Sequence, residues 1–168
     1  CRIQGEYSTA QSHLDTAYRM YHEHGSNVWE AVVLCFLADN ELSQGDLSAA
    51  QFHILAASNH LKLADNKLAN TNVCHFRGLL AYYQGDAEGA AELLGESVAL
   101  ARTGLYEPDI ARSLIALARV RRALGEVMQA TELILEALDL FNKYGHKLGV
   151  AITLEELAAV YTVQRDVA

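Results

Sequence analysis

Four arginines lie close together in the second half of the chain, and their spacing suits the binding of an anion. Arg112, Arg119 and Arg122 are separated by seven and three residues, so on a helix they share one face, and Arg121 lies beside them. A guanidinium group donates paired hydrogen bonds to a carboxylate or a phosphate. The cluster holds four of the chain's thirteen basic residues. The arginines therefore point to recognition of an acidic or phosphate-bearing group.

A second interpretation gives the same arginines no ligand. They would then be solvated, or paired with acids from neighbouring helices such as Glu155 or Glu156. The sequence leaves both interpretations open. If the arginines bind a partner, reversing the charge at Arg119 and Arg122 is expected to weaken binding and to leave thermal stability nearly unchanged.

No residue pattern in the chain indicates catalysis or a bound metal. The glycines recur singly at long intervals, so there is no phosphate-binding glycine loop and no nucleophile elbow. His22 and His24 are two residues apart and face different sides of a helix, which does not suit a metal site. His53 and His60 fit a helix surface. We therefore expect a protein that is not an enzyme and holds no cofactor or metal.

Charge and composition narrow the class further. Thirteen Lys and Arg against twenty-one Asp and Glu give a net charge of −8, which argues against direct nucleic-acid binding by this segment. Apolar residues never run for about 18 positions, so we expect no membrane span, and no signal peptide is recognisable. The cysteines are odd in number, and Cys35 and Cys74 fall at apolar positions. We expect core thiols and a cytoplasmic protein.

An internal repeat of forty residues organises the whole chain. Glycine recurs at Gly5, Gly45, Gly85 and Gly125, and an acidic residue follows each one. Alanine recurs five residues after each glycine, at Ala10, Ala50, Ala90 and Ala130. A second series falls near the half period, at Gly25, Asp65, Gly104 and Gly145. Each unit therefore divides into two segments of similar length.

Both segments of each unit have the composition and periodicity of helices. The chain has one proline and is rich in Ala and Leu, and apolar residues recur at helical spacing, as at Ile110, Leu114, Leu117 and Ala118. We expect an all-α fold with helices near 8–24, 27–43, 47–64, 67–84, 87–103, 107–124, 127–144 and 147–164. One helix pair cannot bury its own apolar face, so the pairs must stack. Small residues such as Ala38 and Ala50 would let paired helices approach closely.

These columns resemble the tetratricopeptide repeat (TPR). Leu34, Leu37, Ala38 and Ala50 match the motif's leucine, leucine, small and alanine places, and Leu114, Leu117, Ala118 and Ala130 match them again. Gly78 and Ala90 match in the unit between. The chain departs from the motif in its longer period and in lacking the closing proline. The resemblance implies an α-solenoid, a right-handed superhelical stack of antiparallel helix pairs with about eight helices.

The forty-residue period is similar to the superhelical repeats of large bacterial LuxR-type and maltose-activator-type transcriptional regulators. In those proteins an ATP-binding module precedes the array, and a DNA-binding module can follow it. The resemblance implies a sensor or partner-binding arm for signal sensing. The alternative is a stand-alone scaffold that joins two proteins and has no regulatory switch. A phosphate-binding loop upstream, or a helix-turn-helix downstream, would favour the first.

The resemblance also implies where binding takes place. TPR-like arrays usually bind on the concave face, which the first helix of each pair lines. The arginines Arg112, Arg119 and Arg122 lie on one such helix, and the helix before it offers Asn72, His75, Tyr82 and Tyr83. These are the candidate ligand-binding residues. Their partner would be a protein or peptide with anionic groups, or a small effector.

Both ends of the chain look like interior edges of a longer array. The repeat units lie near 1–24 (partial), 25–64, 65–104, 105–144 and 145–168 (partial), and neither end carries a polar capping helix. We therefore expect a fragment of a longer chain. Self-association through the open ends of the solenoid is the alternative.

Overall fold

The computed structural model describes residues 7–62, 66–104 and 107–167, and within them the chain forms only α-helices. The helices are α1 (Tyr7–Glu23), α2 (Asn27–Leu42), α3 (Leu47–His60), α4 (Lys67–Tyr83), α5 (Ala87–Gly104), α6 (Glu107–Ala123), α7 (Val127–Lys143) and α8 (Lys147–Val167). The eight predicted helices and the all-α fold are confirmed. None of the described helices is both long and apolar enough to cross a membrane.

Two helix ends differ from the prediction. The third helix was expected to reach 64, yet α3 ends at His60, after Ser58 and Asn59, which favour helix ends over interiors. The eighth was expected to end at 164, and α8 continues to Val167. The repeat positions Gly5 and Asp65 lie outside the described residues, as do the first six residues of the first partial unit.

The recurring glycines end helices in one shared geometry. Gly45, Gly85 and Gly125 have φ values of 81°, 91° and 80°, the left-handed region that a side chain disfavours. At each, the glycine N–H bonds to the carbonyl three residues back, and the next N–H bonds to the carbonyl five residues back. This is the Schellman motif. Gly25 and Gly145 repeat it at the half period, so these five glycines are explained by the turns, whereas Gly104 is the last residue of α5 and has no positive φ.

The acid after the glycine begins the following helix. Asp46 Oδ1 accepts a hydrogen bond from the Ala49 N–H at 3.0 Å, and Asp86 Oδ1 accepts one from the Gly89 N–H at 2.9 Å. Both carboxylates satisfy a backbone donor that the helix leaves unpaired. Glu126 makes no such bond with its side chain. The two aspartates therefore cap the helices that follow them.

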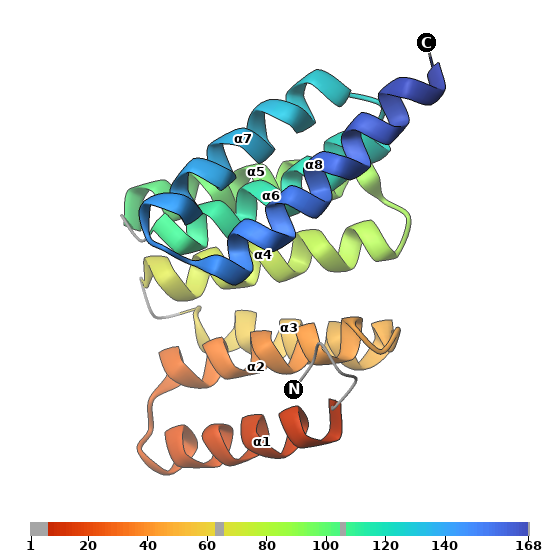
Figure 1. The fold of residues 1–168 in the computed structure, drawn as a ribbon. Coiled ribbons are helices and arrows are strands. Elements are labelled where there is room, and N and C mark those ends of the chain that lie inside the picture. The colour runs from red at the N-terminus through yellow and green to blue at the C-terminus, as the bar shows by residue number, and fades with distance from the viewer. Residues whose placement is uncertain (1–6, 63–65, 105–106, 168) are drawn as a thin grey trace.

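The helices form a solenoid of antiparallel pairs (Figure 1), in which each helix packs on the next along the chain. The first helices of the pairs also pack on one another, α2 on α4, α4 on α6, and α6 on α8. These four helices therefore share one side of the stack. That side carries the candidate site.

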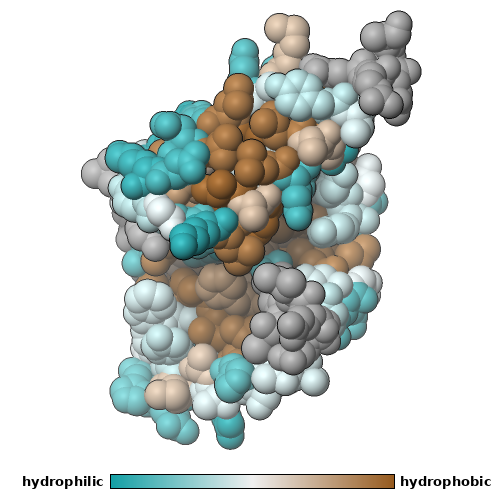
Figure 2. Space-filling view, in the orientation of Figure 1, coloured by the Kyte–Doolittle hydropathy of each residue, from teal (hydrophilic) through white to brown (hydrophobic). Residues whose placement is uncertain are grey.

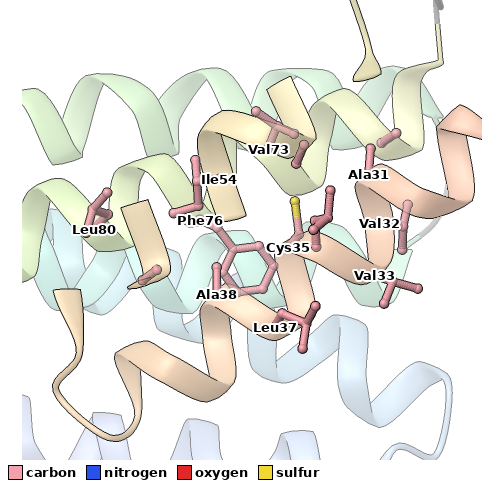
Figure 3. Close-up of a cluster of buried hydrophobic side chains, with 14 of the residues drawn as sticks. Ala31, Val32, Val33, Cys35, Leu37, Ala38, Ile54, Val73, Phe76 and Leu80 are labelled. Carbon is pink, nitrogen blue, oxygen red and sulfur yellow. The ribbon is translucent and has the colours of Figure 1, made fainter. Parts of the chain in front are cut away.

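Small residues lie buried between paired helices. Ala38 and Ala50 are fully buried, and so are Ala90 and Ala130 one and two units later. At Gly78 even a Cβ atom would lie 2.6 Å from Leu94 Cγ. Around Ala38 the core holds larger apolar groups from three helices, with Phe76 between Leu37 and Ile54 (Figure 3). The expectation of close approach at the small columns is confirmed.

Candidate functional site

A half-open pocket of about 430 Å³ lies on the side formed by α2, α4, α6 and α8, and we call this side the groove. Most of the pocket wall is apolar, and this part comprises Phe76, Leu79, Pro108, Ile115, Ala116, Phe141, Leu148 and Ile152. The polar residues in the wall are Asp39, His75, Asp109, Arg112, Arg119 and His146. Hydrophobic surface gathers over α7 and α8 in the upper part of the view, and a second hydrophobic area lies below a hollow on the same face (Figure 2). The volume suits a small molecule or a few side chains of a partner.

Arg112 is held in place from three directions. Its Nη2 donates a hydrogen bond to Asn72 Oδ1 at 2.6 Å and lies 3.1 Å from Asp109 Oδ1. Its Cζ lies 5.7 Å from the centre of the Phe76 ring, which is within cation–π range. Its Nε is buried and has no hydrogen-bond partner among the described residues. Burial raises the pKa of Asp109, and Arg112 opposes that rise. The guanidinium is therefore fixed at the pocket wall before any ligand arrives.

Arg119 and Arg122 share one carboxylate on α8. Arg119 Nε donates to Glu156 Oε1 at 2.6 Å, and Arg122 Nη2 lies 3.6 Å from Glu156 Oε2. The pairing with an acid of a neighbouring helix, which the second interpretation expected, is thus observed at Glu156. Glu155 is exposed and does not take part in these contacts. The bond to Glu156 uses only the Nε of Arg119, and the side chain is 40% exposed. The Nη groups of Arg119 can therefore still donate hydrogen bonds to a ligand.

His75 lies at the pocket wall as a neutral ring. Burial, and then the charges of Arg112 and Arg119, hold its pKa well below the ordinary value. Ser97 donates its only hydroxyl hydrogen to the Thr71 carbonyl at 3.1 Å, so it accepts from Ser113 at 3.0 Å. Ser113 must then accept from His75 Nδ1 at 3.4 Å. The ring hydrogen therefore lies on Nδ1, which leaves Nε2 as an acceptor.

His146, at the other side of the pocket, presents a hydrogen-bond donor where His75 presents an acceptor. Its Nδ1 accepts a hydrogen bond from the Gly149 N–H at 2.9 Å, so in the neutral ring the hydrogen lies on Nε2. The ring also stacks on Phe141, with centroids 5.1 Å apart. His146 is therefore a fixed donor, which sequence reasoning missed because its only signal was a place beside the glycine of a turn.

The structure brings together four of the seven candidate residues. Asn72, His75, Arg112 and Arg119 lie in or directly behind the pocket wall. Arg122 lies outside the pocket wall and is linked to Arg119 through Glu156, which both arginines contact. Tyr82 and Tyr83 lie outside the pocket wall, since seven residues beyond His75 correspond to about 10 Å along a helix. Their role in binding a larger partner stays a prediction.

Residues from α2 and α7 also line the pocket, although neither Asp39 nor Phe141 was among the candidate residues. Asp39 occupies the same place in its unit as Arg119, eighty residues earlier, and the period alone places it on the groove. Phe141 comes from α7, the second helix of a pair, whereas the resemblance implied that first helices line the binding face. Among the described residues, no group of three His, Cys, Asp or Glu side chains is arranged to hold a metal ion. Cys35 and Cys74 are buried, and burial raises their pKa values to about 12 and about 11, as expected of core thiols.

Known structures share this fold. No family model matches the chain, and no curated protein matches it. The chain is similar to the crystal structure of BtubC (BKLC) from P. vanneervenii, with 21% identity and a TM-score of 0.74, over 99% of this chain and 68% of that one. It is also similar to a crystal structure of the nearly identical TPR-like repeats of a putative kinesin light chain from Podosopora anserina, with 19% identity and a TM-score of 0.65, over 98% and 81%.

A third similar structure is a multidomain signalling protein. It is a Signal Transduction ATPase with Numerous Domains (STAND) protein with a tetratricopeptide repeat sensor, from Pyrococcus horikoshii. Identity is 17% and the TM-score is 0.66, over 82% of this chain and only 22% of that one. At such identities the likeness shows the fold alone. The chain is therefore a TPR-like α-solenoid, and the predicted kind of repeat is confirmed.

Proposed function

We propose that this chain is a protein-interaction repeat domain that binds its partner in the groove formed by α2, α4, α6 and α8. The observation that supports this most is a half-open pocket lined by helices far apart in the sequence, with a guanidinium already fixed in its wall. Groups held in place before binding lose little conformational entropy when a partner arrives. Such a surface suits binding, because its apolar wall and its fixed guanidinium can contact the side chains of a partner.

The partner we propose is a protein segment with acidic and apolar side chains. Arg122 and Tyr82 occupy the same place on adjacent first helices, and the half-exposed Tyr83 lies next to Tyr82. The two tyrosine rings lie 5.9 Å apart. Aromatic and arginine side chains carry much of the energy in protein interfaces. This end of the groove therefore extends the binding face beyond the pocket.

A displayed peptide library, selected on the chain, tests this function. We expect selected peptides to be rich in Asp or Glu near a bulky apolar residue. Combining Arg122→Gln with Tyr83→Ala should weaken their binding about tenfold, because both an anchor and a charge are lost. The control is Arg102→Gln, which removes an exposed pair with Glu136 at 2.7 Å between α5 and α7. Selection of no peptide, or equal loss in the control, would count against the groove.

On the finer role, we propose the sensor arm of a multidomain transcriptional regulator of the LuxR or maltose-activator type. The likeness to a solenoid that serves as a sensor in a STAND protein supports it, although that likeness is one of fold. The stand-alone scaffold is favoured instead by the likeness to kinesin-light-chain-like repeats. The gene that encodes the chain separates the two. An ATP-binding module upstream or a helix-turn-helix downstream supports the regulator, and the lack of both supports the scaffold.

A further inference from the structure

The pocket has more specific chemical features than a general protein-binding face requires. Its volume of about 430 Å³ lies in the range of small-molecule sites, toward the lower end. Apolar side chains from α4, α6, α7 and α8 form most of the wall, including Phe76, Ile115, Phe141 and Ile152. A ligand that fills this space would therefore be mainly apolar.

The charged groups of the arginine cluster do not cancel. Arg112, Arg119 and Arg122 form ion pairs with two carboxylates, those of Asp109 and Glu156, so within these pairs one positive charge is in excess; the carboxylate of Asp39 also lies in the pocket wall. The neutral His75 adds none. This excess belongs to the Arg119 end, where two guanidinium groups share the single carboxylate of Glu156.

Arg119 is the group placed to use that charge. It lines the pocket, and Glu156 engages its Nε, so its two Nη groups form a second donor edge on a side chain that is 40% exposed. A guanidinium binds a carboxylate best through such a two-donor edge. Arg112, whose Nη2 is already engaged by Asn72 and Asp109, is the less available of the two.

The pocket also limits how much negative charge it can take. Asp39 lies in the wall on α2, and Asp109 lies in the wall on α6. A second negative charge on the ligand would have to compete with Asn72 and Asp109 for Arg112, whose Nη2 they already engage. The site is therefore unsuited to a phosphate ester or a dicarboxylate.

We propose that the pocket binds a small amphipathic monocarboxylate, with its apolar body between α4, α6 and α8 and its carboxylate on the Nη edge of Arg119. The ligand is a free small molecule, and it competes with a protein partner for the groove. The inference rests on the groove being a binding face, as proposed above. It adds the chemical class of an effector.

Calorimetric titration of the chain with 3-phenylpropionate and with 3-phenylpropionamide tests the proposal. The two probes differ only in charge and hydrogen bonding at one end. We expect the carboxylate to bind at least about tenfold more tightly than the amide, the factor expected for a charge-assisted hydrogen bond. Phenyl phosphate, a dianion of similar size, should bind more weakly than the carboxylate.

Two variants locate the site. Arg119→Gln should remove the preference for carboxylate over amide and leave amide binding unchanged, while Arg122 still holds Glu156. Ile152→Trp should fill the pocket and weaken both probes. Arg102→Gln, on the pair between α5 and α7, is the control and should behave as the unmodified chain. Circular dichroism confirms that each variant is folded.

Three results would overturn the proposal. They are equal affinity for the two probes, an unchanged preference in Arg119→Gln, and no binding of either probe at millimolar concentration. None of these three results bears on the peptide-selection experiment, which depends on Arg122 and Tyr83. Peptide binding without carboxylate binding would reject the effector site and keep the protein-interaction role. Carboxylate binding without peptide binding would do the reverse.

Discussion

The arginines on α6 make different contacts although they share one helix face. Arg112 is held by Asn72 and Asp109, Arg122 is held by Glu156, and Arg119 shares that glutamate while facing the pocket. Charge reversal at Arg119 and Arg122, expected from the sequence to spare stability, would place two new carboxylates beside a largely buried one. The contacts with Glu156 argue against that expectation. Glutamine is the better test substitution because it removes the charge without adding repulsion.

His75 should make stability depend on pH. Its folded-state pKa lies well below that of an unfolded histidine, so below about pH 6.5 the unfolded chain binds a proton that the folded chain does not. The free energy of unfolding should therefore fall as pH falls, by up to about 1.4 kcal/mol per pH unit from this residue. Urea unfolding of the chain and of His75→Gln between pH 7 and pH 5 measures it.

The variant should show the shallower slope, because its side chain does not titrate. His13→Gln, at an exposed position on α1, is the matched control and should keep the slope of the unmodified chain. Identical slopes for the chain and His75→Gln would mean that His75 takes up its proton in the folded state as easily as in the unfolded one.

At the scale of the helix, the glycine–acid turn is followed by two kinds of helix start. After Gly45 and Gly85 an aspartate caps the helix through its side chain. After Gly125 the longer Glu126 leaves the backbone and pairs with Arg121, at 2.7 Å. The glycine is therefore the constant part of the turn, because the left-handed φ is required in every unit. Aspartate or glutamate can follow the glycine, because the carboxylate finds a partner either in the helix backbone or in a nearby arginine.

Two helical glycines should respond oppositely to the same substitution. Gly95→Ala adds a methyl group where no atom lies within 4 Å, so we expect a gain of about 0.5 to 1 kcal/mol from helix propensity. Gly78→Ala gains the same propensity but forces Leu94 to move, since its Cγ would lie 2.6 Å from the new Cβ. Overpacking costs about 1 to 3 kcal/mol, so this variant should be neutral or less stable.

Urea unfolding of the two variants side by side gives the comparison, because each serves as the control for the other. A gain in stability for Gly78→Ala equal to that for Gly95→Ala would show that α4 and α5 have room between them.

At the scale of the molecule, the buried side chains form separate clusters along the solenoid. One cluster joins α2, α3 and α4, with α1 packed against it, and a second is built on α5, α6 and α7 with α8 against it. Helix α4 belongs to both, because Phe76 and Leu80 lie in the first and Leu79 packs against both. Since a solenoid is stabilised by neighbouring units, its two halves need not open together.

Native-state hydrogen exchange on two core variants tests this division. Ile54→Ala and Leu94→Ala each remove a buried side chain and should cost about 2 to 5 kcal/mol. We expect Ile54→Ala to speed exchange mainly in α1 to α3, and Leu94→Ala to speed it mainly in α5 to α8. A uniform increase over all helices in both variants would show that the chain opens as one unit.

The amino-acid sequence by itself determined the repeat, the helices and the turns. These features depend on neighbours in the chain: the left-handed glycine, the capping aspartate and the apolar spacing act within a few residues. It also placed Arg112, Arg119 and Arg122 on one helix face. The small columns at Ala38 and Gly78 required the close stacking that the structure shows.

Only the tertiary structure decided which groups meet in the groove. The pairing of Arg119 with Glu156 and not with Glu155 depends on how α8 is rotated against α6, and one residue corresponds to about 100° around a helix. The arrival of Phe141 in the pocket wall depends in the same way on the angle between units. Those rotations are set by the summed packing of all eight helices. No short stretch of sequence carries them, because each helix face is completed by residues forty positions away.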